Sequence, residues 1–207
     1  MMSRTSNPGF AAASQRLQEL GFSKRAGFIF TRNLTDDVIG WLGLNTASRH
    51  APVGVREVNP VVGVRHQGIE RMVAELRKEK FHPYIPPTVC TPLGYIMTEP
   101  RYRAWMIETP RSDQNSIADL TSAVRQYALP FMEAHASLAG VIALIEARKG
   151  YDHVLAYRRP VAWALADEVG RALSVIDAEE EELANRSDVA ADELRSFIVE
   201  FRKKYAS

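Results

Sequence analysis

The chain has 207 residues, of which 46% are apolar and 25% are charged, and its formal net charge is +1. This balance is ordinary for a globular protein, and a chain of this length can bury a core without disulfides or metal ions. No apolar run approaches the ~18 residues of a membrane span, and the first residues lack the apolar core of a signal peptide. The single cysteine, Cys90, cannot form an internal disulfide, so we expect a cytoplasmic protein.

Charge is distributed unevenly along the chain. Residues 1–66 carry eight Lys or Arg against four Asp or Glu, whereas residues 111–207 carry twelve against sixteen. The N-terminal part of the chain is therefore mildly basic and the C-terminal part acidic, a charge distribution that could steer a charged partner. The polarity is too weak to predict nucleic acid, for which a concentrated basic face is expected.

The N-terminal part begins with a helix expected over residues 9–20, where apolar side chains recur at helical spacing. Gly21 stands where a capping glycine belongs. A strand is expected over residues 27–33. Asp36 and Asp37 then predict a turn, because neighbouring carboxylates on a strand face opposite ways and cannot easily serve one site.

Two more strands, over residues 38–45 and 55–66, extend this pattern to an antiparallel meander. Gly40 and Gly43 indicate a bulge, a bend or a close approach of the backbone. Pro60 cannot donate a hydrogen bond to a neighbouring strand, so it predicts that the third strand is bulged or lies at an edge.

The middle of the chain contains one clear amphipathic helix, over residues 67–80. Four prolines in residues 81–92 predict an irregular segment. Residues 93–109 have the pattern of a hairpin that turns at residues 99–101. This hairpin would bring the sheet to about five strands.

From residue 112 onward the pattern is helical, and Pro130 is expected to kink or end the first helix. The expected helix starts are Ser116, Ser137, Pro160 and Ser187. The predicted fold class is therefore α+β. A mostly antiparallel sheet with flanking helices occupies residues 1–110, and a bundle of about four helices in residues 111–207 packs on it.

No residue pattern in the chain indicates catalysis or metal binding. Cys90 has no evident cationic setting to activate a thiolate. His66 and Glu70 lie at i, i+4 and could share a helix face as metal ligands do, but a solvated ion pair or a helix cap is favoured. We therefore predict no catalytic residue, no metal and no cofactor. A deep pocket joining His66, Glu70 or Cys90 to other polar groups would favour an enzyme instead.

Three charged clusters are candidates for binding a partner, each with a plain structural alternative. The acidic run of residues 177–182 suits a basic partner or is a solvated helix end. Arg101 and Arg103 lie among strand aromatics, which suits binding of single-stranded RNA, although such aromatics more often pack the sheet. Arg158 and Arg159 suit binding of a phosphate or a protein group, or they belong to a polar connection between two helices. The candidate residues are Glu179, Glu180, Glu181, Glu182, Arg101, Arg103, Arg158 and Arg159.

Several short motifs are similar to those of domain-of-unknown-function family 4304, whose members are small bacterial α+β proteins. The stretch LGFSKRAGFIFTRNL at residues 20–34 is followed by VIGWLGLN and VNPVVGVRHQGIERMV. Residues 127–146 and 158–173 resemble later helices of such proteins. The resemblance implies no catalytic residues. It implies a bacterial cytoplasmic protein, and related folds often occur as immunity proteins that bind a toxin.

The sequence thus leaves three functions open. The leading hypothesis is a non-enzymatic protein-binding module, such as an immunity protein that neutralises a toxin. The alternatives are a nucleic-acid-associated or phage-defence factor that uses the basic N-terminal half, and an enzyme with a scattered site. We expect no membrane partner, and the sequence does not predict an oligomeric state.

Overall fold

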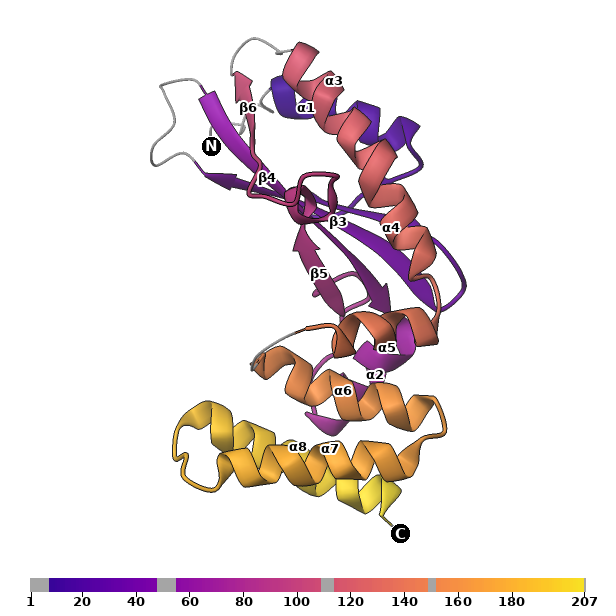
Figure 1. Ribbon diagram of the computed structural model, residues 1–207, viewed down its shortest axis with the longest axis vertical. Coiled ribbons are helices and arrows are strands. Elements are labelled where there is room, and N and C mark those ends of the chain that lie inside the picture. Colours follow the sequence, from indigo (N-terminus) through magenta and orange to yellow (C-terminus); the bar gives the residue numbers. More distant parts are fainter. Residues whose placement is uncertain (1–7, 48–54, 109–113, 149–151, 207) are drawn as a thin grey trace. The chain divides into compact units, whose positions relative to one another are not determined.

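The computed structural model describes residues 8–47, 55–108, 114–148 and 152–206. It has the predicted α+β fold, with an antiparallel sheet and a C-terminal helical region (Figure 1). The chain divides into two compact units, each built from two stretches of sequence: Met1–Val64 with Cys90–Ala134, and Arg65–Val89 with His135–Ser207. These divisions do not coincide with the single boundary predicted near residue 110.

The first unit contains most of a six-stranded sheet. Its strands are β1 (Ser23–Lys24), β2 (Ile29–Asn33), β3 (Val38–Ala47), β4 (Val55–His66), β5 (Val89–Pro92) and β6 (Trp105–Glu108). The order is β1-β2-β3-β4-β5, and β6 also pairs with β4. Because β4 has neighbours on both sides, it is not an edge strand. Pro60 lies just beyond the four residues of β4 that β6 pairs, Val55–Val58.

The glycines of β3 allow close approach and do not mark a bulge in its pairing with β2. The register between β2 and β3 runs unbroken from Ile29 opposite Gly43 to Asn33 opposite Ile39. A side-chain carbon on Gly40 would lie 2.6 Å from the Met132 sulfur. The predicted turn at Asp36 and Asp37 joins the two strands.

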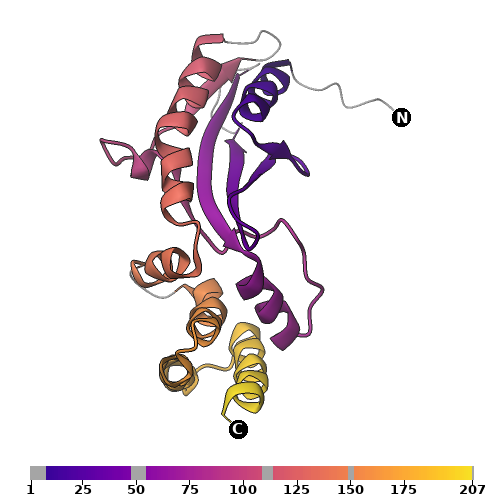
Figure 2. The same cartoon turned by 90° about the vertical axis from the view of Figure 1, so that its right-hand side faces the viewer.

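Helices flank this sheet, and Figure 2 shows the helical stretch of residues 114–134 running along one face. The helices are α1 (Pro8–Glu19), α3 (Gln114–Ala123) and α4 (Leu129–Ala134), and a π-helical turn (Val124–Ala128) joins the last two. Gly21 ends α1 at φ 85°, with Phe22 donating to the Leu17 carbonyl, as the capping prediction required. Pro130 does not end the helix, because it follows a π-helical turn that alters the hydrogen-bond spacing. Ser116 lies inside α3 and is not its cap.

The hairpin predicted for residues 93–109 is wrong. A 3-10 helix, Leu93–Ile96, occupies its first half, and only β6 forms in the second. The proline-rich segment is also more regular than expected, since β5 begins at Val89. Strand pairing with β4 overrides the local sequence in both places.

The second unit is helical. It contains α2 (Gln67–Leu76), α5 (Leu138–Glu146), α6 (His153–Leu165), α7 (Val169–Leu183) and α8 (Val189–Tyr205). Ser137 caps α5 as predicted, by accepting from the Gly140 amide. The cap of α8 is Asp188 and not Ser187.

The helix predicted to begin at Pro160 is in fact two helices. Pro160 lies inside α6, which begins seven residues earlier at His153. The chain then breaks between α6 and α7, where Asp167 adopts φ 61°. The apolar spacing of the two helices runs on across the break, so the sequence pattern did not reveal it.

Aromatic side chains fill the core of the helical unit. Tyr157 and Phe197 meet edge to face with ring centroids 5.1 Å apart, and Phe201 continues the contact along α8. Among the described residues no single helix is long and apolar enough to cross a membrane. One consecutive pair, Gln114–Ala134 with Leu138–Glu146, meets those criteria only when counted together across a bend.

Candidate functional site

The junction of β4 and α2 places three polar side chains, Arg65, His66 and Glu70, close together in the chain. The strand ends at His66 and the helix begins at Gln67, with no loop between them. His66 caps α2, because its Nδ1 accepts from the Ile69 amide at 3.3 Å. Of the two alternatives favoured from the sequence, the helix cap is therefore correct, whereas a solvated ion pair is wrong, because His66 and Glu70 are buried and Glu70 is engaged with other residues.

Glu70 is the centre of a buried ion network. Arg158 forms a bidentate ion pair with it, with Nε 2.7 Å from Oε1 and Nη2 3.0 Å from Oε2. Arg65 Nη1 lies 3.3 Å from Oε2, and the Thr88 hydroxyl donates to Oε1 at 2.8 Å. Thr88 in turn accepts from the His66 amide at 3.0 Å. Strand β4, helices α2 and α6 and the segment before β5 are thereby joined.

The network holds two cations against one carboxylate. Arg65 is 1% exposed and Arg158 5% exposed. Burial lowers the pKa of Arg65 to about 10; Glu70 opposes this shift and Arg158 adds to it. Arg65 also donates to the carbonyls of His82 and Pro86. Two guanidinium groups face one carboxylate, so the network has a formal excess of positive charge inside the unit.

A hollow of about 270 Å³ opens beside this network. We call it the cationic hollow, because its lining has more basic than acidic side chains. The charged residues that line it are Arg65, Arg77, Lys80, Arg158, Glu70 and Glu79, and His82 lies among them. Lys80 pairs with no acidic residue within the described ranges. Its charge is thus not cancelled locally.

The remaining walls of the cationic hollow are largely apolar. They come from Val73 and Ala74 of α2, Ile85 and Pro86 of the following segment, and Val154 of α6. Val154 is 39% exposed, which places it where the hollow meets solvent. The hollow therefore combines a cationic lining with hydrocarbon walls.

The groups that line the hollow are suited to holding an anionic group. The Glu70 carboxylate already accepts from Arg65, Arg158 and Thr88, so its oxygens are occupied. His66 and Cys90 do not line the hollow. Among the residues that the structure describes, no three His, Cys, Asp or Glu side chains gather as a metal site would require.

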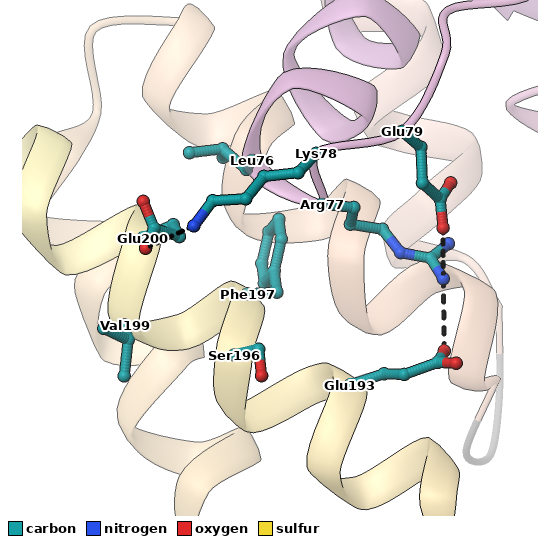
Figure 3. A pocket seen from close by; sticks show the side chains of 9 residues that line it. All are labelled: Leu76, Arg77, Lys78, Glu79, Glu193, Ser196, Phe197, Val199 and Glu200. Carbon is teal, nitrogen blue, oxygen red and sulfur yellow. Dashed lines mark hydrogen bonds and ion pairs between the residues drawn. The ribbon is translucent and has the colours of Figure 1, made fainter.

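A second depression, the α2–α8 groove, adjoins the hollow and measures about 460 Å³. Figure 3 shows Phe197 standing in it, with Lys78 reaching towards Glu200 and Arg77 pointing between Glu79 and Glu193. The Lys78–Glu200 distance is 3.1 Å and the Arg77–Glu193 distance 3.2 Å. Hydrogen bonds from Lys203 and Lys78 lower the pKa of Glu200.

Arg77 and Glu79 line both depressions, so the two form one continuous surface. Their side chains pair at 2.9 Å, and the Arg77 guanidinium lies 4.4 Å from the centre of the Tyr157 ring. The ring and the ion pairs fix the position of the arginine between the hollow and the groove.

The predicted candidate residues do not form one site. Arg158 is a buried part of the ion network and not a surface residue of a polar connection. Arg159 is half-buried and pairs with Glu146 at 3.5 Å. Glu180 binds Arg202 at 2.7 Å, whereas Glu181 and Glu182 are exposed and pair with no cation in the described chain. Burial raises the pKa of Glu179; Arg159 opposes this shift, and Glu182 adds to it.

Arg101 and Arg103 lie in the first unit. Arg101 pairs with Glu99 at 3.3 Å. Arg103 binds Asp119 at 2.8 Å and lies 5.1 Å from the centre of the Trp105 ring. Asp119 also accepts from the Trp105 indole, so this cluster ties β6 to α3.

Sequence reasoning missed Arg65 and Thr88 altogether. The available signal for Arg65 was a basic residue inside an otherwise apolar run at the end of a strand, directly before an amphipathic helix. Thr88 gave no signal, because its role depends on a contact with residues about twenty positions earlier.

Comparison with known proteins adds no relative: the chain matches no protein-family model, no curated protein and no solved structure. The likeness to family 4304 thus stays a prediction from its short motifs.

Proposed function

We propose that the chain is a non-enzymatic protein-binding module that uses the surface formed by the cationic hollow and the α2–α8 groove. The observation that carries the proposal is the continuity of these depressions through Arg77 and Glu79. At about 270 Å³ the hollow is smaller than a typical cofactor pocket of ~300–1,000 Å³, whereas the groove, at about 460 Å³, lies within that range. Together they suit several side chains of a partner.

The chemistry of this surface is that of a protein interface. Arginine is enriched at interfaces, and here the buried Tyr157 ring holds Arg77 at the edge of a groove whose floor is the buried Phe197. Val199 adds an apolar contact point that is 51% exposed. The excess of cations in the hollow complements an acidic segment of the partner.

The biological setting that we propose is an immunity protein, with a toxin as the partner. This extends the expectation from family resemblance, and the cationic lining of the hollow supports it. An immunity protein needs only to cover its toxin, so a tight interface is sufficient for the function.

The proposal is tested with the proteins encoded by genes on either side of this one, purified singly. We expect one of them to bind below micromolar concentration, and its toxicity to be relieved when this chain is co-expressed. Val199→Asp, inside the groove, should weaken binding at least about tenfold, since a buried unpaired charge is costly.

Val189→Asp is the matched control, because Val189 lies on the same helix, is 76% exposed and does not line the groove. It should leave binding unchanged. If none of the neighbouring proteins binds, or if binding survives Val199→Asp, the proposal is wrong.

A further inference from the structure

We infer that the cationic hollow is a binding site for a carboxylate carried on a short aliphatic chain, such as a partner's glutamate side chain or its C-terminal residue. As a statement about the partner, this rests on the proposed function. The site itself is defined by its own chemistry, so free small carboxylates can probe it separately.

The first argument is charge. One carboxylate, Glu70, faces two buried guanidinium groups, so a second anion would balance the network. Arg158 uses Nε and Nη2 for Glu70, and no described residue accepts from its Nη1, which leaves this nitrogen for another acceptor. Arg65 Nε is buried and has no hydrogen-bond partner within the described residues.

The second argument is shape and polarity. A volume of about 270 Å³ accommodates one acidic side chain with its methylene groups but not a nucleotide. The walls from Val73, Ala74, Ile85 and Val154 are hydrocarbon, and inorganic phosphate would leave them without a contact. A carboxylate on an alkyl chain satisfies the cationic and the apolar walls together.

Exposed basic residues at the mouth of the hollow also provide an entrance for such a group. Lys80 and His82 are exposed at the hollow, and Lys80 has no acidic partner among the residues described. An arriving carboxylate would meet this mobile ammonium group before it reaches the buried guanidinium groups. Lys80 therefore adds affinity from outside the buried network, and it can be altered without disturbing the fold.

The test is calorimetric titration of the whole chain with butyrate, its neutral isostere butyramide, and inorganic phosphate, all at constant ionic strength. We expect millimolar binding of butyrate, none of butyramide, and weaker binding of phosphate. Lys80→Met should weaken butyrate binding about three- to tenfold, whereas Lys24→Met, at an exposed lysine of the first unit, should not.

Val154→Asp provides a second variant, because it places a carboxylate of the protein itself at the hollow and should abolish butyrate binding. Circular dichroism confirms that each variant is folded. Equal binding of butyrate and butyramide, tighter binding of phosphate, or no response to Lys80→Met overturns the inference.

The outcomes also separate this inference from the proposed function. If butyrate binds as expected but no neighbouring protein does, the hollow is a carboxylate site and the protein-binding proposal is wrong. If a protein partner binds equally well to wild type, Lys80→Met and Val154→Asp, the proposed function holds and the carboxylate site is wrong.

Discussion

The cationic hollow and the α2–α8 groove use the same ion-pair chemistry in opposite surroundings. In the hollow, Glu70 and its two arginines are almost completely buried. In the groove, Lys78 and Glu193 have side chains that are 73% and 51% exposed. Desolvation makes each buried charge dependent on its partner, whereas water replaces a lost partner in the groove. The first region is therefore expected to be structurally rigid and the second to tolerate change.

The sharpest test of this comparison is Glu70→Gln. It leaves Arg65 and Arg158 buried with no opposing charge, and we expect a loss of about 3–5 kcal/mol in the free energy of unfolding. Glu193→Gln is the control, since Arg77 keeps Glu79 as a partner and the loss should stay below about 1 kcal/mol. Urea titration measures both. Similar losses for the two variants would show that burial does not separate the regions.

Thr88→Val examines the neutral member of the buried network. It removes the donor to Glu70 and the acceptor of the His66 amide at nearly constant volume. We expect a loss of about 1–3 kcal/mol, because two buried polar groups lose a partner. Thr98→Val, which loses only an exposed contact with Tyr127, should change stability far less in the same urea assay. An unchanged unfolding midpoint for Thr88→Val would contradict the account.

One substitution that breaks an ion pair of the groove is expected to raise the stability of the protein. Lys78 ends α2 at φ 56°, a conformation that favours glycine. Lys78→Gly should stabilise the protein by about 0.5–1 kcal/mol despite losing Glu200. Lys78→Met loses the same pair without relieving the backbone, and it should be neutral or slightly destabilising. If the glycine variant is less stable than the methionine variant, this expectation is wrong.

Within the acidic run, Glu179 is partly buried and Glu181 is exposed, so we expect a smaller, pH-dependent difference in stability between their glutamine variants. The pKa of Glu179 is raised above that of the unfolded chain, so its charge disfavours folding at neutral pH and this cost disappears as the pH falls through the folded pKa. Glu179→Gln should therefore raise thermal stability slightly at pH 7, within about 0.5 kcal/mol, and less at pH 4. Glu181→Gln, at an exposed position, is the matched control. A gain that is larger at pH 4 would reverse the sign we expect.

The sequence predicts the elements of this fold better than it predicts the site. Periodic apolar residues located α8, whose stripe of Leu194, Phe197, Ile198 and Phe201 is buried as expected. The pairing of β4 with two later strands is non-local, and for that reason the hairpin prediction failed. Local spacing drew attention to His66 and Glu70, but Arg158 lies 88 positions from Glu70 in the chain. No local pattern can bring such residues together, because only the packing of α6 on α2 does so.

The most direct test of the carboxylate site is a nuclear magnetic resonance titration of the arginine Nε–H groups with butyrate. Burial slows exchange of the Arg65 proton with water, so its signal should be visible in the unbound protein. The account predicts that the Arg65 and Arg158 signals shift together and saturate with butyrate, while butyramide leaves them in place. Signals that stay unchanged while those of surface arginines such as Arg101 move would contradict it.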